Sequence, residues 1–210
     1  MKLIVPLPAK NHTFLKGMII LSMLVMPMSL AQAQSYSTRT AHINVKSVNK
    51  VQNIVADNFQ AACLLDAKTG QFKLIALIKS FEYQIGAMNR MMSTRNINVT
   101  EFPKITYDGN IVNLKQINFS KSGSYAFKFN GMLYIWDEKR MTNAEGIITV
   151  LNEGTIQMKS DFTIALKEAY TQKIDMIMRQ KLPFALNLKP NTLGISKNIQ
   201  VKAEAMMIRR

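Results

Sequence analysis

Apolar and polar side chains alternate along several segments of this chain, and the alternation is clearest between residues 125 and 135. Successive side chains of a β-strand point to opposite faces, so a period of two predicts strands with one buried face. The same period recurs in residues 156–166 and 199–207. Gly131 falls on the apolar face of the first segment, where the missing side chain predicts a sharp bend or extra space.

Eight strands are expected, separated mostly by short polar turns. They cover residues 36–45, 59–66, 71–79, 104–114, 125–135, 145–151, 156–166 and 199–207. We also expect a charged turn at residues 137–143, a short helical insertion around residues 86–92, and no long helix. In the segment 170–193, Pro183 and Pro190 interrupt any long element. The pattern predicts an all-β antiparallel protein, either a sandwich or a closed barrel.

The first 33 residues have the composition of a secretory signal peptide. Three lysines accompany an apolar run at residues 17–30, and Ala31-Gln32-Ala33 is a small-x-small cleavage site. A membrane anchor is the weaker alternative, because spanning needs about 20 apolar residues. This run is shorter and is interrupted by Ser22 and Pro27. We therefore expect cleavage after Ala33, export to the periplasm and a single mature domain at residues 34–210.

The mature chain is basic. Its net charge falls from +14 to +11 when the leader is removed, because the leader contains three lysines and no acidic residue. A basic exported protein is expected to contact anionic membrane surfaces, although a solvated basic surface explains the composition equally well. No nucleic-acid partner is expected, because export removes the chain from nucleic acid and the basic residues are scattered.

Residues that could carry out catalysis or bind metal are scarce. Cys63 is the only cysteine, so no intrachain disulfide can form, and its apolar neighbours predict a buried, unreactive thiol. His42 is the only histidine after residue 33, so we expect no metal site and a surface or hydrogen-bonded role for this side chain. The acids Glu82, Glu101 and Asp108 show no pairing, and no nucleophile–base set is evident. We therefore expect a protein that is not an enzyme.

Several short motifs follow one another between about residues 35 and 207. They are Phe81-Glu-Tyr83, Met88, Phe102-Pro103-Lys104, Gly109-Asn-Ile111, Gly131-Met-Leu133 and the strand at residues 159–166. In their order and spacing they resemble the YceI-like family, exported bacterial proteins with a lipocalin-like barrel that bind polyisoprenoid lipids. The resemblance implies an antiparallel eight-stranded barrel with a hydrophobic small molecule or lipid in its interior.

The resemblance also implies which side chains would contact the ligand, namely the inward faces of the strands and the helical insertion. No cofactor is expected beyond a bound polyisoprenoid or quinone-like lipid. An aromatic stripe at period two is also typical of a plain core, so a self-filled barrel acting as an interaction module remains the alternative. The expected ligand-lining residues are Phe81, Tyr83, Met88, Met92, Ile105, Tyr107, Tyr125, Phe127, Phe129, Leu133, Ile135, Ile156, Met158, Phe162 and Ile164.

The chain departs from the family pattern at two places. Trp136 and Asp137 stand where family members usually carry His-Gly, and Met91 and Met92 replace a His-Phe pair in the helical turn. A metal or acid–base role based on those histidines is therefore not expected.

The methionines of the helical turn, Met88 among them, are expected to form an apolar cap at one barrel end, because methionine packs adaptably. Four basic residues flank this cap, namely Lys79, Arg90, Arg95 and Lys104. They are candidates for contact with an anionic headgroup, and a solvated rim is the simpler alternative. The sequence leaves open whether the barrel forms a homodimer.

Overall fold

The computed structural model describes residues 34–48, 53–86, 88–89, 101–181 and 195–210. The predicted signal peptide at residues 1–33 lies outside the described residues. The elements are β1 (Ser35–Val48), β2 (Asn53–Asp66), β3 (Gln71–Leu77), the 3₁₀ turn η1 (Ile78–Ser80), β4 (Glu82–Tyr83), β5 (Lys104–Ile111), η3 (Leu114–Gln116), β6 (Gly123–Ile135), β7 (Glu138–Asn152), β8 (Thr155–Ala165), α3 (Glu168–Lys181) and β9 (Asn198–Arg209).

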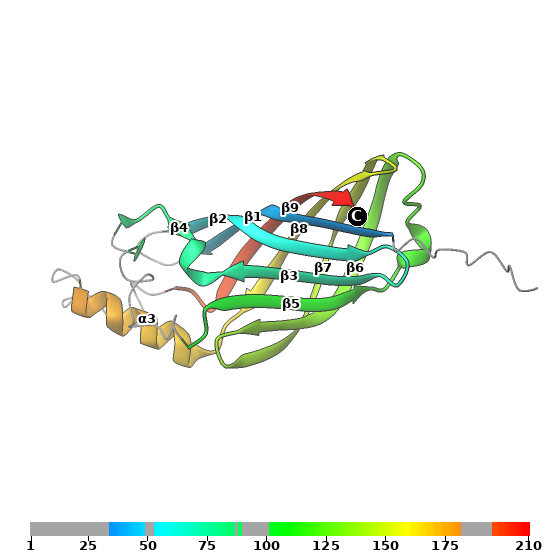
Figure 1. Cartoon of the computed structure of the whole chain (residues 1–210). Coiled ribbons are helices and arrows are strands. Elements are labelled where there is room, and N and C mark those ends of the chain that lie inside the picture. Colours follow the sequence, from blue (N-terminus) through cyan, green and yellow to red (C-terminus); the bar gives the residue numbers. More distant parts are fainter. Residues whose placement is uncertain (1–33, 49–52, 87, 90–100, 182–194) are drawn as a thin grey trace, which may run out of the picture. The chain divides into compact units, whose positions relative to one another are not determined.

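The long strands form one antiparallel sheet that closes on itself (Figure 1). Their order is β1-β9-β8-β7-β6-β5-β3-β2, and β1 also pairs with β2, which completes an eight-stranded barrel. The two-residue strand β4 pairs with β2 at Ala56 and Asp57. The expected barrel is confirmed, and the sandwich is excluded because it would leave two sheets with free edges.

Two glycines allow β5 and β6 to approach closely inside this sheet. Gly109 and Gly131 face each other across the pair of strands. A Cβ atom at Gly131 would lie 2.7 Å from both the Asp108 carbonyl oxygen and the Gly109 Cα atom. The position predicted from sequence to need extra space is therefore one where two backbones leave no room for a side chain.

Two sequence expectations were wrong. Residues 138–143 of the charged turn expected at residues 137–143 belong to β7. The turn itself is only Trp136-Asp137, with Trp136 at a φ of 54°. A two-residue hairpin loop lets both strands keep pairing up to Ile135 and Glu138. The segment 170–193, expected to be irregular, begins within α3, a helix of 14 residues. Pro183 comes two residues after Lys181 in the sequence, and a proline past the last turn does not disrupt earlier hydrogen bonds.

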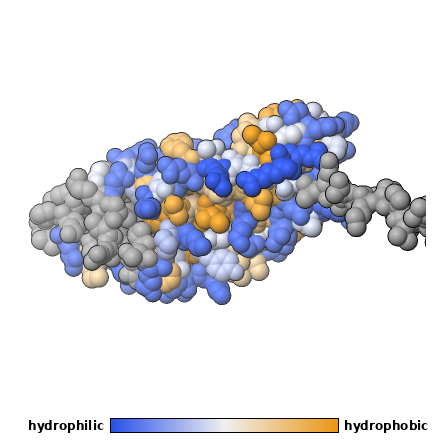
Figure 2. Space-filling view, in the orientation of Figure 1, coloured by the Kyte–Doolittle hydropathy of each residue, from blue (hydrophilic) through white to orange (hydrophobic). Residues whose placement is uncertain are grey.

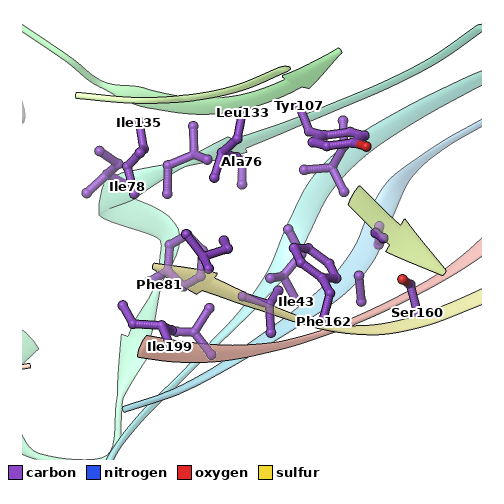
Figure 3. A pocket seen from close by; sticks show the side chains of 18 of the residues that line it. Ile43, Ala76, Ile78, Phe81, Tyr107, Leu133, Ile135, Ser160, Phe162 and Ile199 are labelled. Carbon is purple, nitrogen blue, oxygen red and sulfur yellow. The ribbon is translucent and has the colours of Figure 1, made fainter. Parts of the chain in front are cut away.

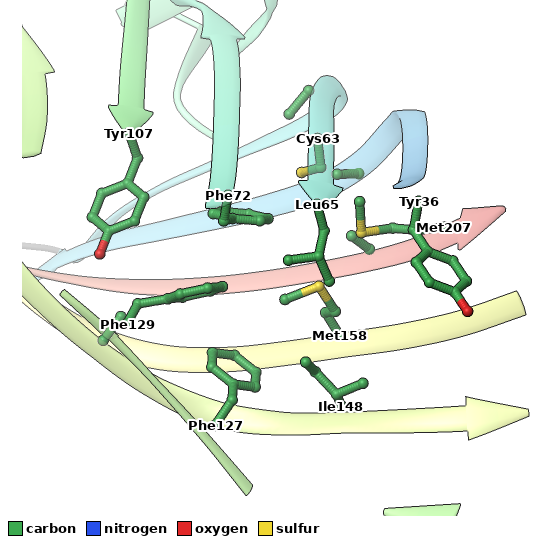
Figure 4. Packing of buried hydrophobic residues seen from close by; sticks show 14 of the residues in the cluster. Tyr36, Cys63, Leu65, Phe72, Tyr107, Phe127, Phe129, Ile148, Met158 and Met207 are labelled. Carbon is green, nitrogen blue, oxygen red and sulfur yellow. The ribbon is translucent and has the colours of Figure 1, made fainter. Parts of the chain in front are cut away.

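One end of the barrel is filled by its own side chains (Figure 4). Tyr36, Leu65, Ile148 and Met207 are at most 1% exposed there, and Phe119 stacks on the Tyr36 ring with 5.8 Å between centroids. These residues come from different strands that the barrel closure brings together. This end behaves as an ordinary close-packed core.

An aromatic group follows the filled end along the barrel interior. Phe129 stacks on Phe72 at 4.5 Å between ring centroids and contacts Phe127 at 4.6 Å. Tyr107 lies at 6.1 Å from Phe129 in a tilted arrangement. Such offset and tilted pairs are favourable geometries for aromatic rings, and they form a floor below the space described in the next subsection.

The outer surface is mixed in character. Figure 2 shows apolar side chains in the middle of the face built by β2, β3 and β5, surrounded by polar and charged ones. Exposed apolar residues on β2 and β3 include Phe59, Leu64 and Leu77. Within the described residues, no helix has the length and apolar character needed to cross a membrane.

Candidate ligand-binding cavity

A cavity of about 180 Å³ occupies the barrel interior beyond the aromatic floor. Its wall is formed by residues of all eight barrel strands and by the segments that cover one barrel end. Figure 3 shows Ile43, Ala76, Leu133, Phe162 and Ile199 directed toward this space. The wall is built almost entirely of aliphatic and aromatic side chains, so it suits hydrocarbon.

The period-two pattern explains why these side chains point inward. In β6, Phe127, Phe129 and Leu133 are buried while the intervening Lys128 and Asn130 are exposed. Because the barrel interior receives every second residue of each strand, apolar positions from distant segments meet around one space.

Short non-strand segments cover the end of the barrel that lies next to the cavity. Ile78 of η1, Leu166 after β8 and Ile174 of α3 line the cavity and are at most 3% exposed. Figure 1 shows α3 beside the end where β3 gives way to η1. The helical insertion contributes Met88, which is 1% exposed and also lines the cavity.

The helical insertion begins at Gly86, within the predicted range. The Met88 backbone N–H donates to the Ile85 carbonyl at 2.8 Å. Asn89 ties this turn to β4, because its side chain accepts from the Tyr83 N–H at 2.6 Å and donates to the Tyr83 carbonyl at 2.8 Å. The turn is thereby held over the cavity. The positions 90–92 of the predicted insertion, including Met91 and Met92, lie outside the described residues.

Burial keeps three titratable groups of the wall, Cys63, Tyr83 and Tyr107, in their neutral forms. Burial raises the pKa of the Cys63 thiol to about 12, that of Tyr107 to about 12, and that of Tyr83 above its ordinary value. Tyr107 Oη donates to the Thr142 carbonyl at 3.0 Å. At neutral pH these groups supply neither a thiolate nor a phenolate, which fits a surface for apolar contact.

Most of the residues predicted from sequence to contact a ligand line this cavity. Met92 lies outside the described residues, and Tyr125 and Ile156 do not line the cavity although they are on inward faces. Ile156 pairs with Met207 at the filled end, and Tyr125 donates its hydroxyl to the Lys121 carbonyl at 3.0 Å. The lining members of the predicted set are Phe81, Tyr83, Met88, Ile105, Tyr107, Phe127, Phe129, Leu133, Ile135, Met158, Phe162 and Ile164.

Sequence reasoning missed the lining residues contributed by other strands and by the cap. Ile43 and Val201 lie on alternating segments that were recognised as strands, so their period-two position was an available signal. Trp136 and Ile174 had no such signal, because the hairpin loop and α3 reach the cavity only through the tertiary fold. The missed residues include Ile43, Val45, Ile54, Phe72, Leu74, Ala76, Ile78, Trp136, Ala144, Leu166, Ile174, Ile195, Ile199 and Val201.

The candidate residues His42 and Asp108 do not line the cavity. His42 Nε2 is 2.7 Å from Asp57 Oδ1. The His42 ring stacks on the exposed residue Phe59, with 4.5 Å between the ring centroids. Asp108 pairs with Lys73 at 3.2 Å. Among the described residues there is no group of three or more side chains that could hold a metal ion.

The fold and the interior together define a class of protein, a closed antiparallel barrel with an apolar cavity under a partly helical cap. A polyisoprenoid binding domain from Saccharophagus degradans, implicated in plant cell wall breakdown, matches 85% of this chain and 99% of its own length with a TM-score of 0.68 and 12% identity. The Campylobacter jejuni YceI protein matches 78% of this chain and 86% of its own, with a TM-score of 0.47 and 13% identity.

This chain therefore has the fold of the YceI-like, polyisoprenoid-binding barrels, and the resemblance read from its motifs is confirmed at the level of the fold. No protein-family model and no curated protein matches the sequence.

Proposed function

We propose that this protein is exported and binds or carries a long-chain amphiphile, an isoprenoid or a similar lipid, with part of the hydrocarbon tail inside the barrel. The observation that carries the proposal is the apolar cavity above the aromatic floor. The shared fold with a polyisoprenoid binding domain supports it. The side chains around Tyr36 and Leu65 fill the other end of the barrel, as the self-filled alternative would require along its whole length.

The size of the cavity sets the contribution of the tail. Filling about 180 Å³ at roughly 24 cal/mol per Å³ is worth about 4 kcal/mol. Burying one five-carbon isoprene unit contributes a similar amount, about 4 kcal/mol at roughly 0.8 kcal/mol per carbon group. The cavity as it stands therefore accommodates about one isoprene unit, and a longer tail extends past the cap or widens the cavity on binding.

The direct test is lipid extraction of the protein purified from a bacterial host, followed by mass spectrometry. A matched variant, Ala76→Leu with Ala144→Leu, adds side-chain volume at two wall positions that are 1% and 7% exposed. We expect a stoichiometric amphiphile with the unmodified protein and loss of it with the double variant. Equal lipid content in both folded proteins would contradict binding inside the barrel.

Export is tested separately from binding. Expression of the full-length chain should yield periplasmic protein that begins at Gln34, because cleavage is expected after Ala33. Mass spectrometry of the intact protein reports the cleavage site. Retention of residues 1–33 on membrane-bound protein would instead support the anchor.

A further inference from the structure

Trp136 occupies an unusual position in the hairpin between β6 and β7. Its φ of 54° lies in the left-handed region, which is unfavourable for a bulky residue and is required at the first position of a two-residue hairpin turn. Its indole ring stacks on Tyr170 of α3, with 4.6 Å between the ring centroids. Trp136 thus joins the hairpin loop to the helix beside the covered end of the cavity.

The indole N–H of Trp136 is buried and has no hydrogen-bond partner among the described residues. Leaving such a donor unpaired is unfavourable, and buried polar groups in proteins are nearly always satisfied. Three other polar side chains of the cavity wall already have partners within the protein. Tyr107 and Ser160 donate to backbone carbonyls, and Ser47 accepts from the backbone N–H of Ser196. The Trp136 N–H is therefore a donor that the protein itself leaves unpaired.

A second, more polar pocket of about 280 Å³ adjoins the cavity at this residue. Trp136 and Ile174 line both spaces. The side chains of Glu101, Asp137 and Lys173 contribute two carboxylates and one ammonium group to the polar pocket. This excess of negative charge disfavours a diphosphate, since like charges repel at close range.

We infer that Trp136 Nε1 donates a hydrogen bond to an uncharged oxygen, a hydroxyl or a carbonyl, in the headgroup of the bound amphiphile. The tail occupies the apolar cavity and the headgroup occupies the polar pocket. This inference rests on the proposed function and adds the chemical class of the headgroup: an uncharged acceptor in preference to a diphosphate.

The experiment compares three probes with the same carbon skeleton. Farnesol carries a hydroxyl group, farnesane is the hydrocarbon without it, and farnesyl diphosphate carries the charged group. The affinity of each compound is measured by displacement of the fluorescent dye N-phenyl-1-naphthylamine. The measurement is made with the unmodified protein, with Trp136→Phe and with Tyr170→Phe. The Trp136→Phe variant keeps an aromatic ring for stacking and removes the N–H, whereas Tyr170→Phe keeps the stack and removes the neighbouring hydroxyl.

We expect the unmodified protein to bind farnesol about tenfold more tightly than farnesane, the size of one hydrogen bond. Farnesyl diphosphate should bind more weakly than farnesol. Trp136→Phe should lose the preference for farnesol while its affinity for farnesane stays unchanged, and Tyr170→Phe should keep the preference.

Three results would overturn the inference. They are an unchanged farnesol preference in Trp136→Phe, loss of the preference only in Tyr170→Phe, or tighter binding of the diphosphate than of farnesol by the unmodified protein. Failure of all three probes would instead overturn the proposed function, so the two failures are distinguishable.

A second substitution protects the test against a folding defect in Trp136→Phe. Trp136 is the only tryptophan in the chain, so biosynthetic incorporation of 3-benzothienylalanine replaces the indole N–H by sulfur at this position with little change in shape. The same loss of the farnesol preference is expected, and retention of it would contradict the inference.

Discussion

Adding leucine side chains to the cavity wall removes the space that a ligand tail would occupy. Ala76 on β3 and Ala144 on β7 both line the cavity. Each substitution to leucine adds roughly three carbon groups, and six such groups correspond to about 5 kcal/mol of burial. That exceeds the value of about 4 kcal/mol for filling the whole cavity, so the double variant should lose the entire cavity contribution.

The expected loss of affinity is large enough to measure easily. A loss of about 4 kcal/mol lowers the affinity for farnesol by roughly a factor of 1,000. Displacement of N-phenyl-1-naphthylamine gives the affinity, and urea titration gives the free energy of unfolding of the ligand-free protein. Because the added groups enter existing space, the free energy of unfolding should change by less than about 2 kcal/mol.

The matched control is Ala126→Leu, the same change at an exposed position on the outer face of β6. It should leave both the affinity and the unfolding free energy close to those of the unmodified protein. A double variant that folds normally and binds farnesol within about threefold of the unmodified protein would refute binding in this cavity. The single variants Ala76→Leu and Ala144→Leu should each show an intermediate loss, which keeps the test valid if the double variant is unstable.

Three further predictions concern stability, measured by urea unfolding. Gly131→Ala should destabilise the barrel by about 1–3 kcal/mol, because its Cβ would meet opposing backbone atoms at 2.7 Å, whereas Gly154→Ala, with only a 3.6 Å neighbour, should have a small effect. Burial opposes ionisation of Asp57, but hydrogen bonds from side chains including His42 outweigh the effect of burial and lower the pKa of Asp57. The stabilisation that the Asp57 carboxylate provides should therefore be lost as pH falls below about 4. An Asp57→Asn variant that loses stability in acid as steeply as the unmodified protein would contradict this. Burial raises the pKa of Cys63 from 9.0 to about 12, so the thiol of the unfolded chain ionises at a lower pH than that of the folded protein. The free energy of unfolding should therefore fall as pH rises above about 9, and it should fall less steeply in Cys63→Ala.

The sequence was sufficient to locate most strands and their buried faces. The alternation in residues 125–135 and 156–166 matches the burial in β6 and β8, because the period of two is a local property of the strand backbone. Most strand boundaries followed from it, and so did the lining residues on these two segments apart from Ser160 and Leu166. Tyr125 and Ile156 were predicted in the same way and do not line the cavity.

The helix α3 shows where local reasoning failed. Ile174 and Asp175 are buried on one side of this helix while Gln172 and Lys173 are exposed. This helical pattern of buried and exposed residues is short. Pro183 and Pro190 lie in the same segment, residues 170–193, and led to the prediction that the segment is irregular. The contact between Tyr170 and Trp136 that places the helix beside the cavity joins residues far apart in sequence, so no local pattern reports it.

The sequence by itself determined which side of each strand avoids water, since that depends only on the order of apolar and polar residues. The tertiary structure decided what the inward sides do. Closure of β1 on β2 sets the height of each inward residue along the barrel. Ile156 therefore meets Met207 in a filled core, while Phe162 and Ile164, further along the same strand, face a cavity. Inward positions share the same alternating sequence pattern. The sizes of the side chains opposite them across the barrel decide whether they fill a core or line a cavity.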